Sequence, residues 1–410
     1  MDAQTPVTQA PPRAPASPYA LLALLMAMTA IGPLTLNILV PAVPNLVATM
    51  DADLGTVQLT ISLYLFGLAV SQLVLGPLSD RFGRRPVVIA GLTLTALASV
   101  LAIAMSSIGA LIAARIIQAL GASTGLVVGR AIIRDLYDRE RAASMIGWVT
   151  TVMVVAPMVA PLIGGLLDTA FGWESIFVFV AVMSFAVLTW AFAALPETRP
   201  DHVTGGGVRF IAGETRKLFG DRNFIGYVLV ASIATATFFA FLGGAPHLVI
   251  GVMGRSSAEY GAWFALTAFG YMVGNLIAAR MSPRFGVDNM IRAGVGLQIL
   301  GAAASIVLAT LFPLGGPETV FPAQFLLSCG NGIFLPNAIA GAISVRPQAA
   351  GTASGIVGFA QMGLGAVAAQ TMSYVITHSA SAQPMAWTMF ILAGLAMVLF
   401  MVLVKPTPTR

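Results

Sequence analysis

The sequence is dominated by long apolar runs that are separated by short polar connections. A bilayer-spanning helix needs about 20 mostly apolar residues, and twelve runs meet that length. They cover residues 19–43, 55–78, 86–105, 108–129, 143–167, 174–195, 224–250, 259–280, 289–312, 319–343, 350–375 and 385–404. Charged residues make up 9% of the chain, against about 25% in soluble domains. We therefore predict an all-α membrane protein with twelve transmembrane helices, because backbone groups in lipid must pair within each helix.

A short sequence repeat divides the chain into two halves. Arg81-Phe82-Gly83 recurs as Arg284-Phe285-Gly286, and each copy joins the second and third apolar run of its half. Two pseudo-symmetric six-helix bundles in parallel orientation are expected from such a repeat. In the second copy, Pro283 stands where the first has Asp80.

The remaining segments are predicted to lie outside the bundles. Residues 1–17 are rich in Pro, Ala and Ser and are expected to form a disordered cytoplasmic tail, followed by an uncleaved first helix rather than a secretory signal. Two bundles, 18–195 and 224–404, are then joined by a cytoplasmic linker at 196–223, and 405–410 form a cytoplasmic tail. Within the linker, Val208–Phe219 is read as an amphipathic helix on the inner leaflet or as a solvated loop.

The placement of basic residues predicts the orientation in the membrane. If both termini are cytoplasmic, 19 of the 21 Lys and Arg residues fall on the cytoplasmic side, while Arg255 falls outside and Arg115 within a span. This asymmetry follows the positive-inside rule. It also accounts for the net charge of +5 without nucleic acid as a partner. Lipid and a small molecule are the expected partners.

The sequence contains no pattern that indicates enzyme chemistry. The single Cys329 excludes a disulfide framework and a multi-cysteine metal site. A phosphate-binding loop and a nucleophile–histidine arrangement are also absent from the sequence. No cofactor and no metal are expected, and the chain is not expected to be an enzyme.

The turn between the second and third runs resembles the signature loop of the major facilitator superfamily. The matching residues are Gly76, Leu78, Asp80, Arg81, Gly83, Arg84 and Arg85. The stretch from Arg115 to Ser123, the stretch from Ala156 to Gly165 and Arg134-Asp135-Leu136-Tyr137 are similar to the bicyclomycin/chloramphenicol exporter branch of its drug:proton antiporters. The resemblance implies the major facilitator fold, multidrug efflux and antibiotic resistance, a bacterial inner-membrane location, protons as coupling ion and a monomer.

The resemblance also implies a gate at the cytoplasmic face. We expect the gating residues to be Gly76, Asp80, Arg81, Gly83, Arg84, Arg130 and Arg134. In such transporters the acid contacts an arginine at the end of the fourth helix, here Arg130 or Arg134, and the start of the eleventh helix near Gly351. A simpler interpretation treats the arginines of the loop as topological anchors only.

The fifth run combines helix-bending and helix-packing residues. Pro157 and Pro161 each remove a backbone donor and bend the helix. Gly164 and Gly165 allow a neighbour to approach closely, and the expected neighbour is the eighth run with Gly270 and Gly274. The predicted result is a tight seam between the halves.

Polar side chains within the spans are the candidates for the substrate or proton pathway. They are, with one aromatic residue, Asn37, Tyr64, Arg115, Gln118, Phe239, His247 and Gln361. Arg115 in a span costs roughly 2.5–3.5 kcal/mol or more unless it finds a cavity or acceptors, or extends to the periplasmic interface. We place it with Gln118 against the first helix, near Pro33 and Asn37.

Asn37 stands where relatives of the resembled branch commonly carry an aspartate, and asparagine cannot titrate. The 16 acidic residues fall in loops or at helix ends, so the energy source stays open. The leading expectation is export of small hydrophobic drugs or xenobiotics by alternating access, coupled to proton antiport. The alternative is an exporter or facilitator of a neutral or anionic metabolite without carboxylate-based coupling. A membrane sensor on a transporter scaffold is a third reading.

Overall fold

The structure is a computed structural model that describes residues 18–137, 139–199, 208–313, 315–346, 349–379 and 381–405. Secondary structure in these residues is entirely helical. The helices of the first half are α1 (Pro18–Ile38), η1 (Val40–Ala42), α2 (Val43–Thr49), α3 (Leu54–Phe82), α4 (Arg84–Ile103), α5 (Ile108–Leu136), α6 (Arg139–Phe171) and α7 (Glu174–Ala194). After α8 (Val208–Phe219) come α9 (Arg222–Pro246), η2 (His247–Val252), α10 (Ser257–Phe285), α11 (Val287–Leu311), η3 (Pro317–Thr319), α12 (Phe321–Ser344), α13 (Ala350–Thr377) and α14 (Gln383–Leu403).

The predicted transmembrane helices are confirmed as an all-α membrane fold. Eleven segments of the described residues are long and apolar enough to cross a membrane, with α1, η1 and α2 counted as one segment. The twelfth is α6, which has 33 residues and an apolar part at Val155–Phe171. Large apolar side chains such as Phe66, Leu101 and Leu311 are at least half exposed on the outer faces. This exposure suits a surface that meets lipid.

The two halves repeat the same local structure. Helices α3 and α10 have 29 residues each and begin at side-chain caps, Asp53 on Thr56 N and Ser256 on Glu259 N. Each ends at a glycine with positive φ, Gly83 at 100° and Gly286 at 78°. Only glycine adopts this backbone conformation without strain. The same turn is therefore built twice, although the acid of the first copy is absent from the second.

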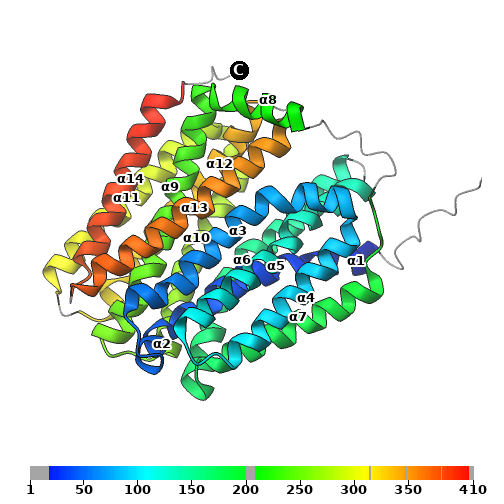
Figure 1. Ribbon diagram of the computed structural model, residues 1–410. Coiled ribbons are helices and arrows are strands. Elements are labelled where there is room, and N and C mark those ends of the chain that lie inside the picture. The colour runs from blue at the N-terminus through cyan, green and yellow to red at the C-terminus, as the bar shows by residue number, and fades with distance from the viewer. Residues whose placement is uncertain are drawn as a thin grey trace, which may run out of the picture.

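Figure 1 shows α1 to α7 gathered on one side of the molecule and α9 to α14 on the other, with α8 across one end. We call this end the arginine-rich end, because Arg81, Arg84 and Arg85 lie there with the start of α1 and the end of α14. The opposite end is where α1 passes into η1 and α10 begins. These two ends are the frame for the site.

The linker helix is confirmed at Val208–Phe219. It packs against α9 and α13, with Leu218 fully buried in the second half. Glu214 is 5% exposed and forms ion pairs with Lys217 at 2.8 Å and Arg346 at 3.2 Å. The linker helix is thus attached to the second half by apolar and ionic contacts. The tail predicted at 1–17, all but the first residue of the tail predicted at 405–410, and the linker residues 200–207 lie outside the described residues.

Candidate substrate cavity and gate

A cavity of about 360 Å³ lies between the two halves, which is a suitable size for a small organic ligand. Four helices of each half line it: α1, α3, α5 and α6, and α9, α10, α12 and α13. Among the lining residues are Leu36, Asn37, Leu68, Gln72, Ser123, Arg130, Met153, Pro157, Thr235, Phe238, Phe239, Thr267, Tyr271, Asn275, Asn331, Gln361 and Met362. The corresponding helices of both repeats therefore form the walls.

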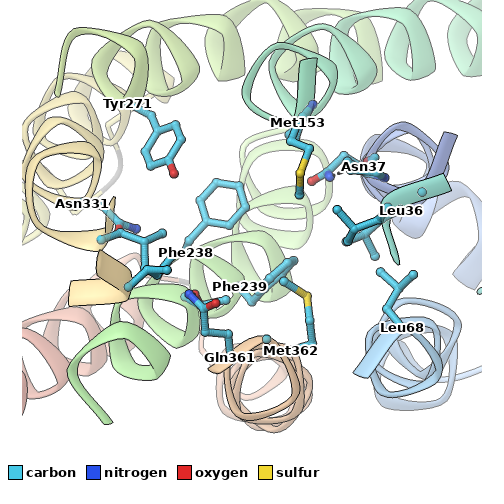
Figure 2. A pocket seen from close by; sticks show the side chains of 18 of the residues that line it. Leu36, Asn37, Leu68, Met153, Phe238, Phe239, Tyr271, Asn331, Gln361 and Met362 are labelled. Atoms are coloured by element: carbon cyan, nitrogen blue, oxygen red, sulfur yellow. Dashed lines mark hydrogen bonds between the residues drawn. The ribbon is translucent and has the colours of Figure 1, made fainter. Parts of the chain in front are cut away.

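The wall of the cavity is mainly apolar, with a few polar groups. Figure 2 shows Phe238, Phe239 and Met362 grouped on one side, and the Tyr271 hydroxyl pointing into the space. Gln361 is fixed in this wall, because its Nε2 donates to Thr235 Oγ1 at 3.1 Å. Flexible thioethers and aromatic rings adapt to ligands of different shape. Phe239 and Gln361 are therefore cavity residues, as predicted from the sequence.

Arg130 is the one charged side chain among the described lining residues. It is partly buried on α5, and its Nη2 lies 3.5 Å from the Met153 sulfur. A thioether is a weak acceptor, so most N–H donors of Arg130 remain available to other groups. The sequence placed Arg130 in the gate, and the structure places it in the cavity wall.

Asn37 also lines the cavity, one helical turn after Pro33 of α1. Its Nδ2 donates to the Pro33 carbonyl at 2.7 Å. Its Oδ1 is buried and has no hydrogen-bond donor among the described residues. No carboxylate occurs among the described lining residues. The predicted position of Asn37 on the pathway fits this geometry.

Arg115 has a different place from the one expected on the pathway. It is 1% exposed and is not a lining residue of the cavity. It donates to the Thr60 and Thr35 carbonyls at 3.2 and 3.0 Å and to Gln118 Oε1 at 2.6 Å. The guanidinium also lies 4.1 Å from the centre of the Tyr64 ring. Internal acceptors thus offset most of the cost of burial. The bond to Thr35 confirms the expected place of Arg115 against the first helix, near Pro33 and Asn37, and the alternative of an extension to the periplasmic interface is wrong.

Two partners of Arg115 are likewise packed inside the first half. Gln118 Nε2 donates to Ser99 Oγ at 2.7 Å, and the Tyr64 hydroxyl donates to the Gly32 carbonyl at 3.1 Å. Both side chains are buried away from the cavity. His247 begins η2 near the opposite end and does not line the cavity either. These three residues do not form the wall that the sequence analysis predicted.

Polar contacts join the two halves at the opposite end. Ser257 of α10 donates to Asp168 Oδ2 at 2.6 Å and lies 3.1 Å from the Pro41 carbonyl. Asn45 Nδ2 donates to Asp168 Oδ1 at 2.9 Å. A second contact has Gln370 Nε2 donating to the Gly55 carbonyl at 2.8 Å. The cavity is therefore closed at this end, a feature that no local sequence signal predicts.

Close helix packing completes this seal. A Cβ atom on Gly165 would lie 2.2 Å from the Ser257 carbonyl oxygen of α10. The predicted contact between α6 and α10 is thus confirmed for Gly165, on the helix that contains Pro157 and Pro161. The neighbour predicted for Gly164 is wrong, because its Cβ position would meet the Ile38 carbonyl of α1 in the same half.

The predicted participation of Gly270 and Gly274 in that seam is wrong. Their Cβ positions would meet the backbone of Phe325 and Cys329 on α12. The glycine of α10 that packs against α6 in the described residues is Gly261, which meets Pro161. Gly270 lies nine residues, about 14 Å, further along the axis, past the point where α6 and α10 cross.

The turn Gly76–Pro86, here called the signature turn, is held by Arg84. This side chain is 4% exposed and contacts Asp80 at 2.5 Å, Asp135 at 2.9 Å and Ser79 Oγ at 2.6 Å. The predicted partners of Asp80 are therefore replaced by Arg84, which is nearer in the chain. Of the partners predicted for Asp80, Arg134 is exposed, and Gly351 has no neighbour within 4 Å of the position that a Cβ atom would occupy.

The other residues of the signature turn have separate surroundings. Arg81 is exposed, and its carbonyl accepts from Arg199 at 2.8 Å. Gly83 is required by its positive φ. Gly76 has no neighbour within 4 Å of the position that a Cβ atom would occupy.

Glu197 completes the turn and was missed by the sequence analysis. It follows α7 and accepts backbone N–H groups of Arg84 at 2.9 Å, Arg85 at 3.2 Å and Arg199 at 2.9 Å. Partial burial opposes ionisation, but these hydrogen bonds outweigh it and lower the pKa of Glu197. Glu197 thus caps α4, because the N-cap residue Gly83 has no side chain that could accept these N–H groups. A cap from 113 residues away has no pattern in one sequence.

Comparison with known proteins shows which protein family the chain belongs to. Residues 25–369 match the sequence profile of the Major Facilitator Superfamily, and the chain belongs to this family of membrane transporters. It is 32% identical to multidrug resistance protein D of Escherichia coli over 82% of this chain and 84% of the relative. It is 26% identical to a bicyclomycin resistance protein homolog of Haemophilus influenzae over 88% and 90% of the two chains. A chloramphenicol resistance protein of Pseudomonas aeruginosa is 31% identical over 77% and 73%.

Solved structures support the fold alone. The crystal structure of a D-xylose–proton symporter has a TM-score of 0.77 at 13% identity, covering 96% of this chain and 99% of the other. A bacterial homologue of the human lysosomal transporter Spinster, in an inward-facing and unoccupied conformation, has a TM-score of 0.73. The predicted fold class is confirmed.

Proposed function

We propose that this chain exports small lipophilic drugs or xenobiotics across the bacterial inner membrane by alternating access. The carrying observation is the cavity of about 360 Å³ between the halves, which has an apolar wall and, in the described residues, polar contacts between the halves at the end opposite the arginine-rich one. Relatives named for multidrug, bicyclomycin and chloramphenicol resistance support the same activity. Transport leaves the substrate chemically unchanged, and a single copy of the chain contains the whole cavity.

We assign the arginine-rich end to the cytoplasm, because cytoplasmic loops of membrane proteins carry excess Lys and Arg. Both termini are then cytoplasmic, and the cavity is accessible from the cell interior. The bundles 18–195 and 224–404 would rotate against each other as two rigid bodies. Parting of Asp168 from Ser257 would open the other face.

We further propose that the signature turn is the cytoplasmic gate. Arg84 and Glu197 hold the turn in shape, while Asp80 is 45% exposed and is paired with Arg84 alone. When the halves close at this face, Asp80 is free to contact the second half. Arg81 and Gly83 would act as parts of the same turn.

Proton antiport is the energy source that the family supports for export against a gradient. The described lining residues hold no carboxylate, and this observation favours a second candidate. In it, the protein exports or facilitates a neutral or anionic metabolite without carboxylate-based proton coupling. The two candidates share the cavity and differ in their dependence on pH.

Flux in proteoliposomes tests both candidates. The full chain is reconstituted, and efflux of chloramphenicol and of other antibiotics is followed with and without an imposed pH gradient, with protein-free liposomes as control. Drug export predicts saturable flux above the control. A flux that the pH gradient increases supports proton antiport. A flux that is independent of the pH gradient supports transport without carboxylate-based proton coupling. Absence of flux for every compound would refute drug export.

A further inference from the structure

We propose that the cavity selects amphiphilic organic anions, with Arg130 binding the carboxylate or sulfonate and the aromatic wall binding the apolar body. The inference rests on the proposed transport function and specifies the substrate class of the same cavity. It is carried by the charge of the lining residues and by where that charge lies along the cavity.

Arg130 has unused binding capacity. A guanidinium carries five N–H donors that match the two oxygens of an oxyanion. One nitrogen contacts the Met153 sulfur, and none of the ion pairs among the described residues involves Arg130. An anionic ligand would therefore not have to displace a carboxylate of the protein. Charge-assisted pairs of this kind are also the stronger class of hydrogen bond.

The charge and the aromatic rings lie at different depths. Arg130 is six residues from the end of α5, which is about 9 Å below the arginine-rich end. Phe238 is 16 residues from the start of α9 at the same end, about 24 Å along that helix. Phe239 and Met362 lie beside it (Figure 2). The cavity thus carries a positive charge near the arginine-rich end and an apolar wall deeper inside. This arrangement complements an amphiphilic anion, which has a negative charge at one end and an apolar body at the other.

The same arrangement disfavours organic cations. In the described lining residues, neutral groups such as Asn37, Gln361 and Asn331 are the polar alternatives to Arg130. A ligand ammonium group would meet no carboxylate there and would be repelled by Arg130. Neutral ligands keep the apolar contacts and lose only the pairing with the guanidinium. The expected order of affinity is anion, then neutral compound, then cation.

A matched ligand series tests this order on one carbon skeleton. Radiolabelled 4-phenylbutanoate is bound to the full-length protein in phosphatidylcholine nanodiscs, and 4-phenylbutanamide and 4-phenylbutylammonium are used as competitors. The variants are Arg130→Ala, Arg130→Gln and Arg130→Lys. Arg280→Ala is the control, because Arg280 is an exposed arginine of α10 that does not line the cavity. Thermal unfolding reports whether each variant is folded.

We expect Arg130→Ala and Arg130→Gln to weaken phenylbutanoate binding about tenfold to a hundredfold. The same variants should change the affinity of the amide less than about threefold, since it makes no ionic bond. Arg130→Lys should retain part of the binding, and Arg280→Ala all of it.

Failure of the wild type to bind phenylbutanoate overturns the inference, as does tighter binding of the ammonium compound. If the Ala variant does not fold, the Gln variant and the wild-type order of affinity still decide the outcome. Neither result depends on antibiotic flux. A selective cavity without drug export would refute the proposed function alone, and drug export with a reversed order would refute this inference alone.

Discussion

Arg115 should hold the first half together and leave ligand binding unaffected. The test is Arg115→Met, which keeps much of the side-chain volume and removes all donors. Three hydrogen bonds and the contact with the Tyr64 ring disappear in this variant. The acceptors, which include Gln118 Oε1, stay buried without their partner. The variant therefore separates a structural role from a role in the pathway.

The magnitude follows from these contacts. Hydrogen bonds from a charged donor contribute about 1.5–3 kcal/mol each, and a desolvated cation–π contact about 2 kcal/mol. Burial of the ion offsets part of this sum, since its desolvation costs several kcal/mol. Three acceptors left without a donor cost about 1–3 kcal/mol each, so with that offset we expect a net loss of about 3–5 kcal/mol. With about 2–4 °C per kcal/mol for a bundle of this size, the unfolding midpoint should fall by about 6–20 °C.

Thermal unfolding in nanodiscs measures the shift, and phenylbutanoate binding below the midpoint measures the site. Arg130→Ala is the matched control for stability, because Arg130 is partly buried and contacts only a sulfur. We expect its midpoint to move by less than a third of the Arg115→Met shift. A stable Arg115→Met protein that binds ligand tenfold more weakly would refute the reasoning and restore Arg115 to the pathway.

Three further outcomes are expected. Asn37→Asp adds a titratable group to the cavity wall, so binding of cationic compounds should strengthen and become pH-dependent; an unchanged pH profile would place Asn37 outside the pathway. Glu197→Ala should lower stability by about 1–2 kcal/mol through loss of the α4 cap. Because the folded-state pKa of Glu197 is lowered, its contribution is complete above its ordinary value and is lost as pH falls through the lowered one. Unfolding midpoints should therefore differ most at neutral pH and converge in acid. Gly165→Ala should cost about 1–3 kcal/mol by overpacking against Ser257, whereas Gly394→Ala, which has open space, should be nearly neutral in the same measurement.

Regular features of the chain were accessible from the sequence. Apolar run length is a property of each segment by itself, and it predicted the transmembrane helices. The alternation of basic and apolar residues in Val208–Phe219 indicated the linker helix. The repeat predicted the pairing of Gly83 with Gly286, because a turn that needs positive φ leaves glycine in both copies. Asn37 and Gln361 were also found, since polar residues within spans are few, and Phe239 was chosen correctly among many aromatic residues of the spans.

The direction of side chains was not accessible in the same way. Arg115 and Arg130 both belong to α5. Arg115 is buried within the first six-helix bundle, whereas Arg130 lines the cavity. Helix rotation decides this, and rotation is set by neighbours that a single sequence does not reveal. Gly270 and Gly274 were assigned to the wrong neighbour for this reason. Glu197 was missed because its partners are distant in the chain.

The seal between Asp168 and Ser257 has a consequence for energetics. A hydrogen bond between neutral groups, such as Gln370 to Gly55, contributes about 0.5–1.5 kcal/mol net, and one to a carboxylate, such as Ser257 to Asp168, about 1.5–3 kcal/mol. The seal holds no ion pair among the described residues, and its helices meet through glycine rather than interlocked large side chains. Two conformations that differ by a few kcal/mol exchange readily, and the minor one stays populated. In the proposed alternating-access cycle, the modest binding energy of a small ligand would then be enough to decide which face of the membrane is open.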